Sequence, residues 1–297
     1  MKKKNTLRVS AAERAFDWFN VVLLFFLMVI TLYPMLYVLF ASFSDPARFA
    51  LHQGILLRPQ GFSLSSYTAV WKNPMIGRGY LNTLSLVISG TLLNLFMTSL
   101  CAFVLSRRRL PYKKALALLV LFTMYFSGGL IPRYLIISGL GLLDSYFAIL
   151  LPTAISTYNM IVMRTSFENI PECLEESAAI DGANDLIILT RIILPLSMPV
   201  IAVMLLFYGV GHWNSWFNAM IYLRTRTKYP LQLILREILI TNSLDSMTTD
   251  IGSLDKEPIG ETIKYATIIV ATLPVLFIYP FLQKYFTKGI MLGAVKS

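Results

Sequence analysis

The sequence predicts an all-α integral membrane protein with six transmembrane helices and both termini in the cytoplasm. The mean hydropathy of the 297-residue chain is +0.64, and only 14% of its residues are charged. In ordinary soluble domains about a quarter of the residues are charged. Apolar stretches also recur along the chain, each long enough to supply the roughly 20 helical residues that cross a hydrocarbon core of about 30 Å. These stretches are residues 18–43, 80–105, 115–137, 144–163, 196–217 and 264–282.

The first stretch, residues 18–43, is expected to be a retained transmembrane helix. It is too long for the apolar core of a signal peptide, and no small-residue cleavage pattern follows it. A cytoplasmic tail (1–17) would precede it, and an extracytoplasmic loop (44–79) would follow. Two cysteines provide no disulfide framework.

The distribution of basic residues predicts the orientation. Six spans place two sets of segments on opposite sides of the membrane. One set holds fifteen Lys and Arg in 71 residues, and it comprises 1–17, 106–114, 164–193 and 283–297. The other set holds nine in 88 residues, and it comprises 44–79, 138–143 and 218–263. Because Lys and Arg collect on the cytoplasmic side, the first set is expected there. The net charge of +10 therefore indicates topology rather than nucleic-acid binding.

The predicted cytoplasmic loop between the fourth and fifth spans is unusually acidic. Six of the sixteen acidic residues lie between Glu168 and Asp185. The anionic inner leaflet attracts basic segments, so an acidic loop is expected to contact a protein partner instead. A helix starting at Pro171 would end at Gly182, where glycine accommodates a left-handed backbone. A second helix would begin near Asp185, which makes residues 168–195 a helical hairpin continuous with the fifth span.

Two other interpretations of this hairpin follow from its residues alone. A solvated acidic loop with a glycine turn is the simpler one. A DNA-reading helix-turn-helix is disfavoured, because its second helix must offer basic or polar side chains, whereas this one is rich in Leu and Ile.

The hairpin resembles the cytoplasmic signature of permease subunits of binding-protein-dependent ABC importers. That signature reads E-A-A, three residues, G, nine residues, I-x-L-P. The matching residues are Glu176, Ser177, Ala178, Gly182, Ile192, Leu194 and Pro195. One small residue, Ser177, replaces the first alanine. The resemblance covers about residues 80–282, which would form the transmembrane core of a type I ABC importer permease, followed by a cytoplasmic tail (283–297).

The resemblance implies that the hairpin is a coupling element that docks into a cleft of a cytoplasmic ATPase dimer. The acidic cluster would then complement a basic cleft, with Glu176 pairing and Ala178 lying against the ATPase. The C-terminal residues 293–297 would also reach the ATPase. The expected docking residues are Glu175, Glu176, Ser177, Ala178, Ala179, Asp181, Gly182, Ile192, Leu194 and Pro195.

The same resemblance implies the other partners and the role of the chain. A second homologous permease, an extracytoplasmic solute-binding protein and the bilayer of a prokaryotic cell membrane are expected, and nucleic acid is not. The outer loop tip (241–258) would reach the binding protein. The sequence has no G-x-x-x-x-G-K-[ST] motif, so ATP and Mg are expected on the separate ATPase. We expect no catalytic residues, metal site or bound cofactor in this chain, and we do not expect it to be an enzyme by itself.

The chain is most similar to the carbohydrate group of these permeases, and to the smaller maltose-type subunit. One stretch, GVGHWNSWFNAMIYL (209–223), could contact sugar, through aromatic stacking and amide hydrogen bonds. Its candidate residues are His212, Trp213, Asn214, Trp216 and Asn218. An interfacial aromatic belt is the alternative that the residues favour. Polar residues elsewhere in the spans are expected to contact neighbouring helices, namely Asn82, Asn94, Ser156 and Asn159.

Two alternative functions remain open from the sequence. An importer permease for an amino acid, phosphate or peptide is the first. An ion-driven secondary carrier is the second, although such carriers often place charged residues inside their spans, and no carboxylate lies at the centre of a span here.

Overall fold

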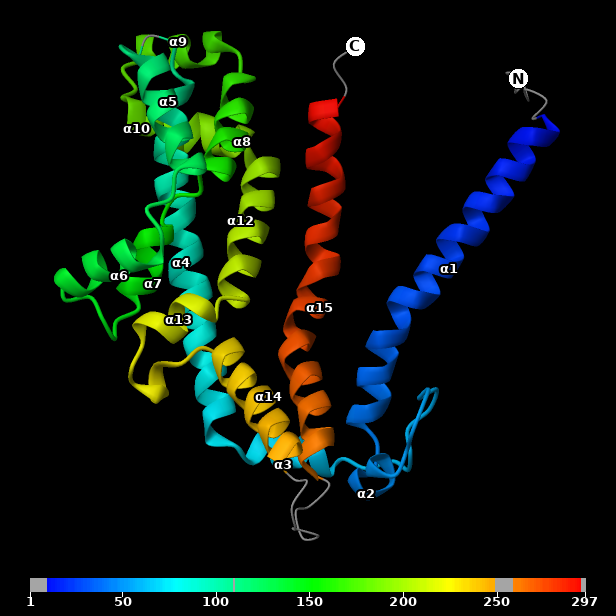
Figure 1. The fold of residues 1–297 in the computed structure, drawn as a ribbon. Helices are drawn as coiled ribbons and strands as arrows, with labels where there is room; N and C mark the ends of the chain where they lie inside the picture. The colour runs from blue at the N-terminus through cyan, green and yellow to red at the C-terminus, as the bar shows by residue number, and fades with distance from the viewer. Residues whose placement is uncertain (1–9, 109, 249–258, 295–297) are drawn as a thin grey trace. The chain divides into compact units, whose positions relative to one another are not determined.

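The computed structural model describes residues 10–108, 110–248 and 259–294, and it is mostly helical in these ranges (Figure 1). The chain divides into two compact units. The first comprises Met1–Lys72 and Thr241–Val270, and the second comprises Asn73–Ile240 and Ala271–Ser297. Parts of the predicted N-terminal tail, outer loop tip and C-terminal tail lie outside the described residues.

The first unit is built on long helix α1 (Ala11–Ser42). This helix begins with a capping box, in which Ser10 and Glu13 each bond the other's backbone N–H. The helix therefore starts before residue 18, where the predicted span begins. The unit also contains α2 (Pro46–Ala50), α3 (Ser65–Lys72) and the first part of α15 (Ile259–Ala294).

The core of the first unit is a small aromatic cluster. Tyr37, Phe49 and Tyr265 pack edge to face, with ring centroids 5.6–6.4 Å apart, a geometry that aromatic pairs prefer. A buried hydrogen bond of 2.8 Å from Ser66 to Thr262 also joins α3 to α15. These contacts hold α15 against the segments that follow α1.

The second unit carries most of the remaining helices. They are α4 (Pro74–Ser106), α5 (Lys113–Tyr125), α6 (Leu130–Gly139), α7 (Phe147–Leu150), α8 (Thr157–Glu168), α9 (Glu172–Ile180), α10 (Asp185–Ile188), α11 (Leu194–Leu196), α12 (Met198–Trp213), α13 (Phe217–Tyr222) and α14 (Leu231–Thr248), the last of which crosses the unit boundary. A π-helical segment, Leu189–Ile193, joins α10 to α11. Short 3₁₀ turns occupy Leu151–Thr153 and Arg226–Lys228.

Helix α4 is the axis of the second unit, because both α8 and α12 pack along it. The packed core contains residues that are fully buried or nearly so, including Ala102, Met163, Ile193 and Met204. Figure 1 shows α9 and α10 beside one end of α4 and α13 along its other half. The second arrangement is fixed by contacts of Leu86 in a cluster with Ala219 and Leu223.

Two of the predicted spans are bent in their interior, and a third is bent at its start. Helices α5 and α6 meet at 109°, the helix pair Phe147–Thr153 and Thr157–Glu168 at 50°, and Asp185–Leu196 and Met198–Trp213 at 87°. The predicted spans 115–137 and 144–163 are therefore not single helices. The third bend lies at the start of the predicted span 196–217, most of which is the single helix α12. At the first break, Gly129 directly precedes α6 and has φ +88°, a backbone conformation that favours glycine and is not helical. Prolines at 152 and 199 accompany the other two breaks.

Only α1 and α4 are, among the described residues, single helices long and apolar enough to cross a membrane. The total rises to as many as five if each bent pair counts as one crossing. The predicted sixth span, 264–282, lies within α15. The exact number of crossings stays a prediction.

Candidate functional site

The hairpin at 168–195 has the helix-turn-helix geometry that the sequence predicts. Helix α9 follows Pro171, and Gly182 ends the turn with φ +84°. The N–H of Ala183 bonds the carbonyl of Ala178 at 2.9 Å. Helix α10 begins where the Asn184 side chain accepts a 2.9 Å hydrogen bond from the N–H of Ile187. The hairpin is thus defined by local signals.

The inner face of α9 is held by ion pairs to the basic segment 106–114. Glu175 pairs with Arg107, and Glu172 lies 2.8 Å from Arg108. Glu168, at the end of α8, accepts bonds from Lys113 at 3.0 Å and from Arg164 at 3.1 Å. At least three of the six acidic residues, namely Glu168, Glu172 and Glu175, therefore pair with basic side chains of the same chain. The expectation was that the acidic cluster as a whole complements a partner. The pairing with segment 106–114 could not be predicted from the sequence, because the two segments are far apart in the chain.

Arg107 occupies the junction between α4 and the hairpin. It caps α4, and its guanidinium lies 3.8 Å from the centre of the Phe103 ring. Burial lowers the pKa of Arg107 because it disfavours the charged form, and the charges of Asp185 and Glu172 oppose this shift. The Arg107 side chain thus contacts both Phe103 of α4 and Glu175 of α9.

The predicted docking residues divide between two faces of the hairpin. Ala178, which is expected to lie against the ATPase, is partly buried and packs against the core of the second unit. Ile192 and Leu194 are half-buried, and Glu175 faces Arg107. The remaining members are exposed, and we call this exposed set the outer face of the hairpin; they are Glu176, Ser177, Ala179, Asp181, Gly182 and Pro195. Ile180, which the sequence analysis did not single out, is 86% exposed on the same face.

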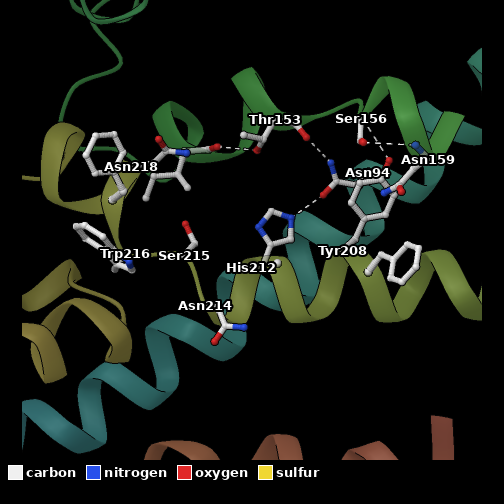
Figure 2. A pocket seen from close by; sticks show the side chains of 14 residues that line it. Asn94, Thr153, Ser156, Asn159, Tyr208, His212, Asn214, Ser215, Trp216 and Asn218 are labelled. Atoms are coloured by element: carbon white, nitrogen blue, oxygen red, sulfur yellow. Dashed lines mark hydrogen bonds between the residues drawn. The ribbon is translucent and has the colours of Figure 1, made fainter. Parts of the chain in front are cut away.

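A cavity of about 500 Å³ lies beside the middle of α4, where Asn94 lines it (Figure 2). Four of the five sugar-contact candidates line it, namely His212, Asn214, Trp216 and Asn218. Trp213 does not line it; this side chain is buried, and its ring centre lies 6.2 Å from that of Tyr80. The sequence did not associate the other polar lining residues with this site, and they are Asn94, Thr153, Ser156, Asn159, Tyr208 and Ser215.

Asn94 and His212 form the central hydrogen-bonded pair of the cavity. The Asn94 amide donates to the carbonyls of Thr153 at 2.6 Å and Ala154 at 2.9 Å, so its oxygen accepts from His212 Nε2 at 2.6 Å (Figure 2). Gly90 makes room for the imidazole, because a Cβ there would lie 2.5 Å from Nε2. These bonds join α4, α12 and the turn before α8. The expectation that Asn94 contacts neighbouring helices is confirmed.

The cavity wall is polar but carries no Lys, Arg, Asp or Glu among its described lining residues. Amide and hydroxyl groups can exchange hydrogen bonds with a hydroxylated ligand, and Trp216 provides an aromatic surface. Arg236 from α14 stacks on Trp216, with its guanidinium carbon 3.7 Å from the ring centre. This composition suits a neutral polyhydroxylated surface better than an isolated ion.

A group of hydrogen bonds to the Asp144 carboxylate, which we call the charged tie, joins two loops of the second unit. The Asp144 carboxylate accepts bonds from the N–H groups of Arg224 and Thr225, from the Thr225 hydroxyl at 2.6 Å and from Lys228 Nζ at 2.8 Å. The bond from Lys228 and those from Thr225 hold the pKa of the Asp144 carboxyl far below its usual range. The tie fixes the loop before α7 to the loop after α13.

No protein-family model matches the sequence, but relatives of known role do. The polygalacturonan/rhamnogalacturonan transport system permease protein YtcP of Bacillus subtilis (strain 168) is 44% identical over 286 residues, which cover 96% of this chain and 99% of that protein. A chain in the crystal structure of a bacterial ABC transporter involved in the import of the acidic polysaccharide alginate matches with a TM-score of 0.85 and 33% identity, over 95% of this chain and 100% of that one.

A second solved structure shares the fold at lower similarity. It is the bacterial alginate ABC transporter in complex with alginate pentasaccharide-bound periplasmic protein, and the match has a TM-score of 0.57 and 19% identity over 90% of this chain and 94% of that one. The helical architecture, the hairpin and the extent of these matches lead to one conclusion. The chain belongs to the family of membrane permease subunits of carbohydrate ABC importers.

Proposed function

We propose that this chain and a second permease subunit form the translocation pathway of an ATP-driven oligosaccharide importer. In this proposal a separate ATPase dimer binds ATP and Mg and docks on the outer face of the hairpin at 168–195. A solute-binding protein delivers the oligosaccharide from outside the cell. The observation that carries the proposal is a hairpin with an exposed outer face, in a chain that matches importer permeases over nearly its whole length.

The proposed topology has six spans and cytoplasmic termini, with the hairpin on the cytoplasmic side. The excess of Lys and Arg in the segments on that side supports this orientation. Cys173 is exposed at the start of the hairpin, so an impermeant maleimide should label it in inverted vesicles and not in intact cells. Labelling in intact cells would contradict the orientation, and a Cys173→Ser variant controls for reaction at Cys101.

The proposed substrate is an oligosaccharide, and the cavity is proposed to contact its rings. Hydroxyl and amide groups together with Trp216 support this assignment. The relatives named above serve polygalacturonan/rhamnogalacturonan and alginate transport, so galacturonate oligomers are the first probes. The cavity wall lacks cationic side chains among its described residues, so carboxylates of such a sugar are expected to be recognised elsewhere in the complex.

The docking proposal is tested by changing one exposed side chain on the hairpin. Ile180→Glu places a charge at the centre of the proposed interface and should abolish co-purification of the ATPase together with sugar uptake. Leu51→Glu is a matched control, because Leu51 is 85% exposed and Ile180 is 86% exposed, yet Leu51 lies in the predicted outer loop. Retention of the ATPase by the Ile180→Glu permease would overturn the docking assignment.

A further inference from the structure

We propose that the ion pair between Arg107 and Glu175 is the positioning contact through which movement of the hairpin reaches α4 and the cavity. The inference rests on the proposed function, since it assumes that an ATPase acts on the outer face of the hairpin. Arg107 and Glu175 are positioning residues in this account, and neither touches nucleotide or sugar.

Two ion pairs link α9 to the end of α4, and they differ in exposure. The side chains of Arg107 and Glu175 are 23% and 19% exposed, whereas those of Arg108 and Glu172 are 78% and 49% exposed. Exposed pairs contribute little, because water and salt screen them and ordering two long side chains is unfavourable. The Arg107–Glu175 pair is therefore the stronger mechanical link, and the Arg108–Glu172 pair provides an internal comparison.

Arg107 is attached firmly on the α4 side of this link. Its guanidinium covers the ring of the buried residue Phe103, and stacking of this kind stabilises a cation. Its Nε and Nη2 atoms are buried and have no hydrogen-bond partner among the described residues. Glu175 bonds the remaining Nη1 atom. Loss of Glu175 would thus leave a partly buried cation with little compensation.

Helix α4 connects this link to the cavity. It is one helix from Pro74 to Ser106, so Asn94 lies about 20 Å from Arg107 at 1.5 Å per residue. Asn94 in turn holds His212 on α12 and the carbonyls before α8. A shift of the hairpin that pulls on Arg107 would therefore move a wall of the cavity through one rigid element and a short series of hydrogen bonds.

The hairpin has a separate contact on α8 that keeps it folded when this link is broken. Glu168 pairs with Lys113 and Arg164, and Ala178 packs against the core. Ile180, at the centre of the proposed docking surface, lies five residues after Glu175 on α9 and so points about 140° away from it around the helix axis. Breaking the Arg107–Glu175 pair should therefore leave the docking surface intact and remove only the transmission of movement.

The test is a charge exchange in the complete transporter, reconstituted in vesicles with its ATPase, second permease and galacturonate-loaded binding protein. Arg107→Glu and Glu175→Arg should each retain the ATPase on purification. Each should reduce uptake and binding-protein-stimulated ATP hydrolysis by about tenfold, which is within the range for coupling contacts. The double variant, Arg107→Glu with Glu175→Arg, should recover most of both activities. Arg108→Glu, the exposed control, should stay near wild type.

Three results would overturn the inference. Wild-type uptake in both single variants would show that the pair does not transmit movement. No recovery in the double variant would show that the two residues do not act as a pair. Loss of the ATPase from the single variants would show that the pair only shapes the docking surface. None of these results bears on whether Ile180 is needed for docking, so failure of this inference and failure of the proposed function are distinguishable.

Discussion

The hairpin end of α4 and its cavity region, at the middle of the helix around Gly90 and Asn94, are stabilised by different kinds of interaction. At the hairpin, carboxylates and basic side chains form ion pairs at a partly exposed surface. In the cavity, neutral amides, hydroxyls and one imidazole form hydrogen bonds, and the described lining includes no Lys, Arg, Asp or Glu. Ionised groups are costly to bury, whereas neutral polar groups are tolerated when they are hydrogen-bonded. Ion pairs therefore stabilise α4 at the partly exposed hairpin, and hydrogen bonds between neutral groups stabilise it within the helical core.

The largest loss of stability is expected in the cavity region of α4, where Gly90 packs closely against His212. Gly90→Ala would place a Cβ 2.5 Å from His212 Nε2 and displace the ring from Asn94. Overpacking of this kind costs roughly 1–3 kcal/mol, so both thermal stability in detergent and sugar uptake should fall. Gly77→Ala is the matched control on the same helix, because no atom lies within 4 Å of its added Cβ. Equal melting temperatures for the two variants would contradict the close packing of Gly90 against His212.

A smaller effect is expected at the hairpin, where the constraint is conformational rather than steric. Gly182 has φ +84°, and no atom lies within 4 Å of an added Cβ. Gly182→Ala should therefore cost about 1 kcal/mol of backbone strain and partly reduce co-purification of the ATPase. Gly182→Asn should be milder, since Asn tolerates this conformation better. If the Ala and Asn variants were equally impaired, the backbone would not be the cause.

The smallest effect concerns the charged tie at Asp144 and depends on pH. The pKa of the carboxyl is lowered in the folded protein, so the tie stabilises the fold at pH values above the unfolded pKa of about 4 and is lost as the pH falls further. Asp144→Asn should lower the melting temperature slightly at pH 7. The difference from wild type should shrink progressively below about pH 4. A difference that is constant from neutral to acid pH would show that the charge of Asp144 is not responsible.

The hairpin was predictable from sequence because its determinants are local. A glycine at the turn, an asparagine at the next helix start and fixed spacings lie within 28 residues, and the structure confirms the two helices. What sequence could not show was which acidic residues face inward. Arg107 and Glu175 are far apart in the chain, and Ala178, three residues after Glu175 on α9, packs against the core.

The cavity was only partly predictable because its walls come from distant segments. His212 and Trp216 drew attention as polar and aromatic residues in an apolar stretch, but Asn94 lies 118 residues from His212 and meets it only when α4 packs on α12. The breaks within the predicted spans were missed for a related reason. In the stretch 115–137, the length of the apolar run predicted a span, and the break that Gly128 and Gly129 indicate was not predicted.

The most direct test of the account measures whether the hairpin controls the cavity. A single cysteine replaces Ser215 in a permease that also carries Cys101→Ser and Cys173→Ser, and its rate of maleimide labelling is measured in the complete transporter. We expect trapping of the ATPase in its ATP-bound state to change this rate severalfold, and Arg107→Glu to abolish the change although the ATPase stays bound. The same nucleotide-dependent change in the presence and absence of Arg107→Glu would contradict the claim that the Arg107–Glu175 pair links the hairpin to the cavity.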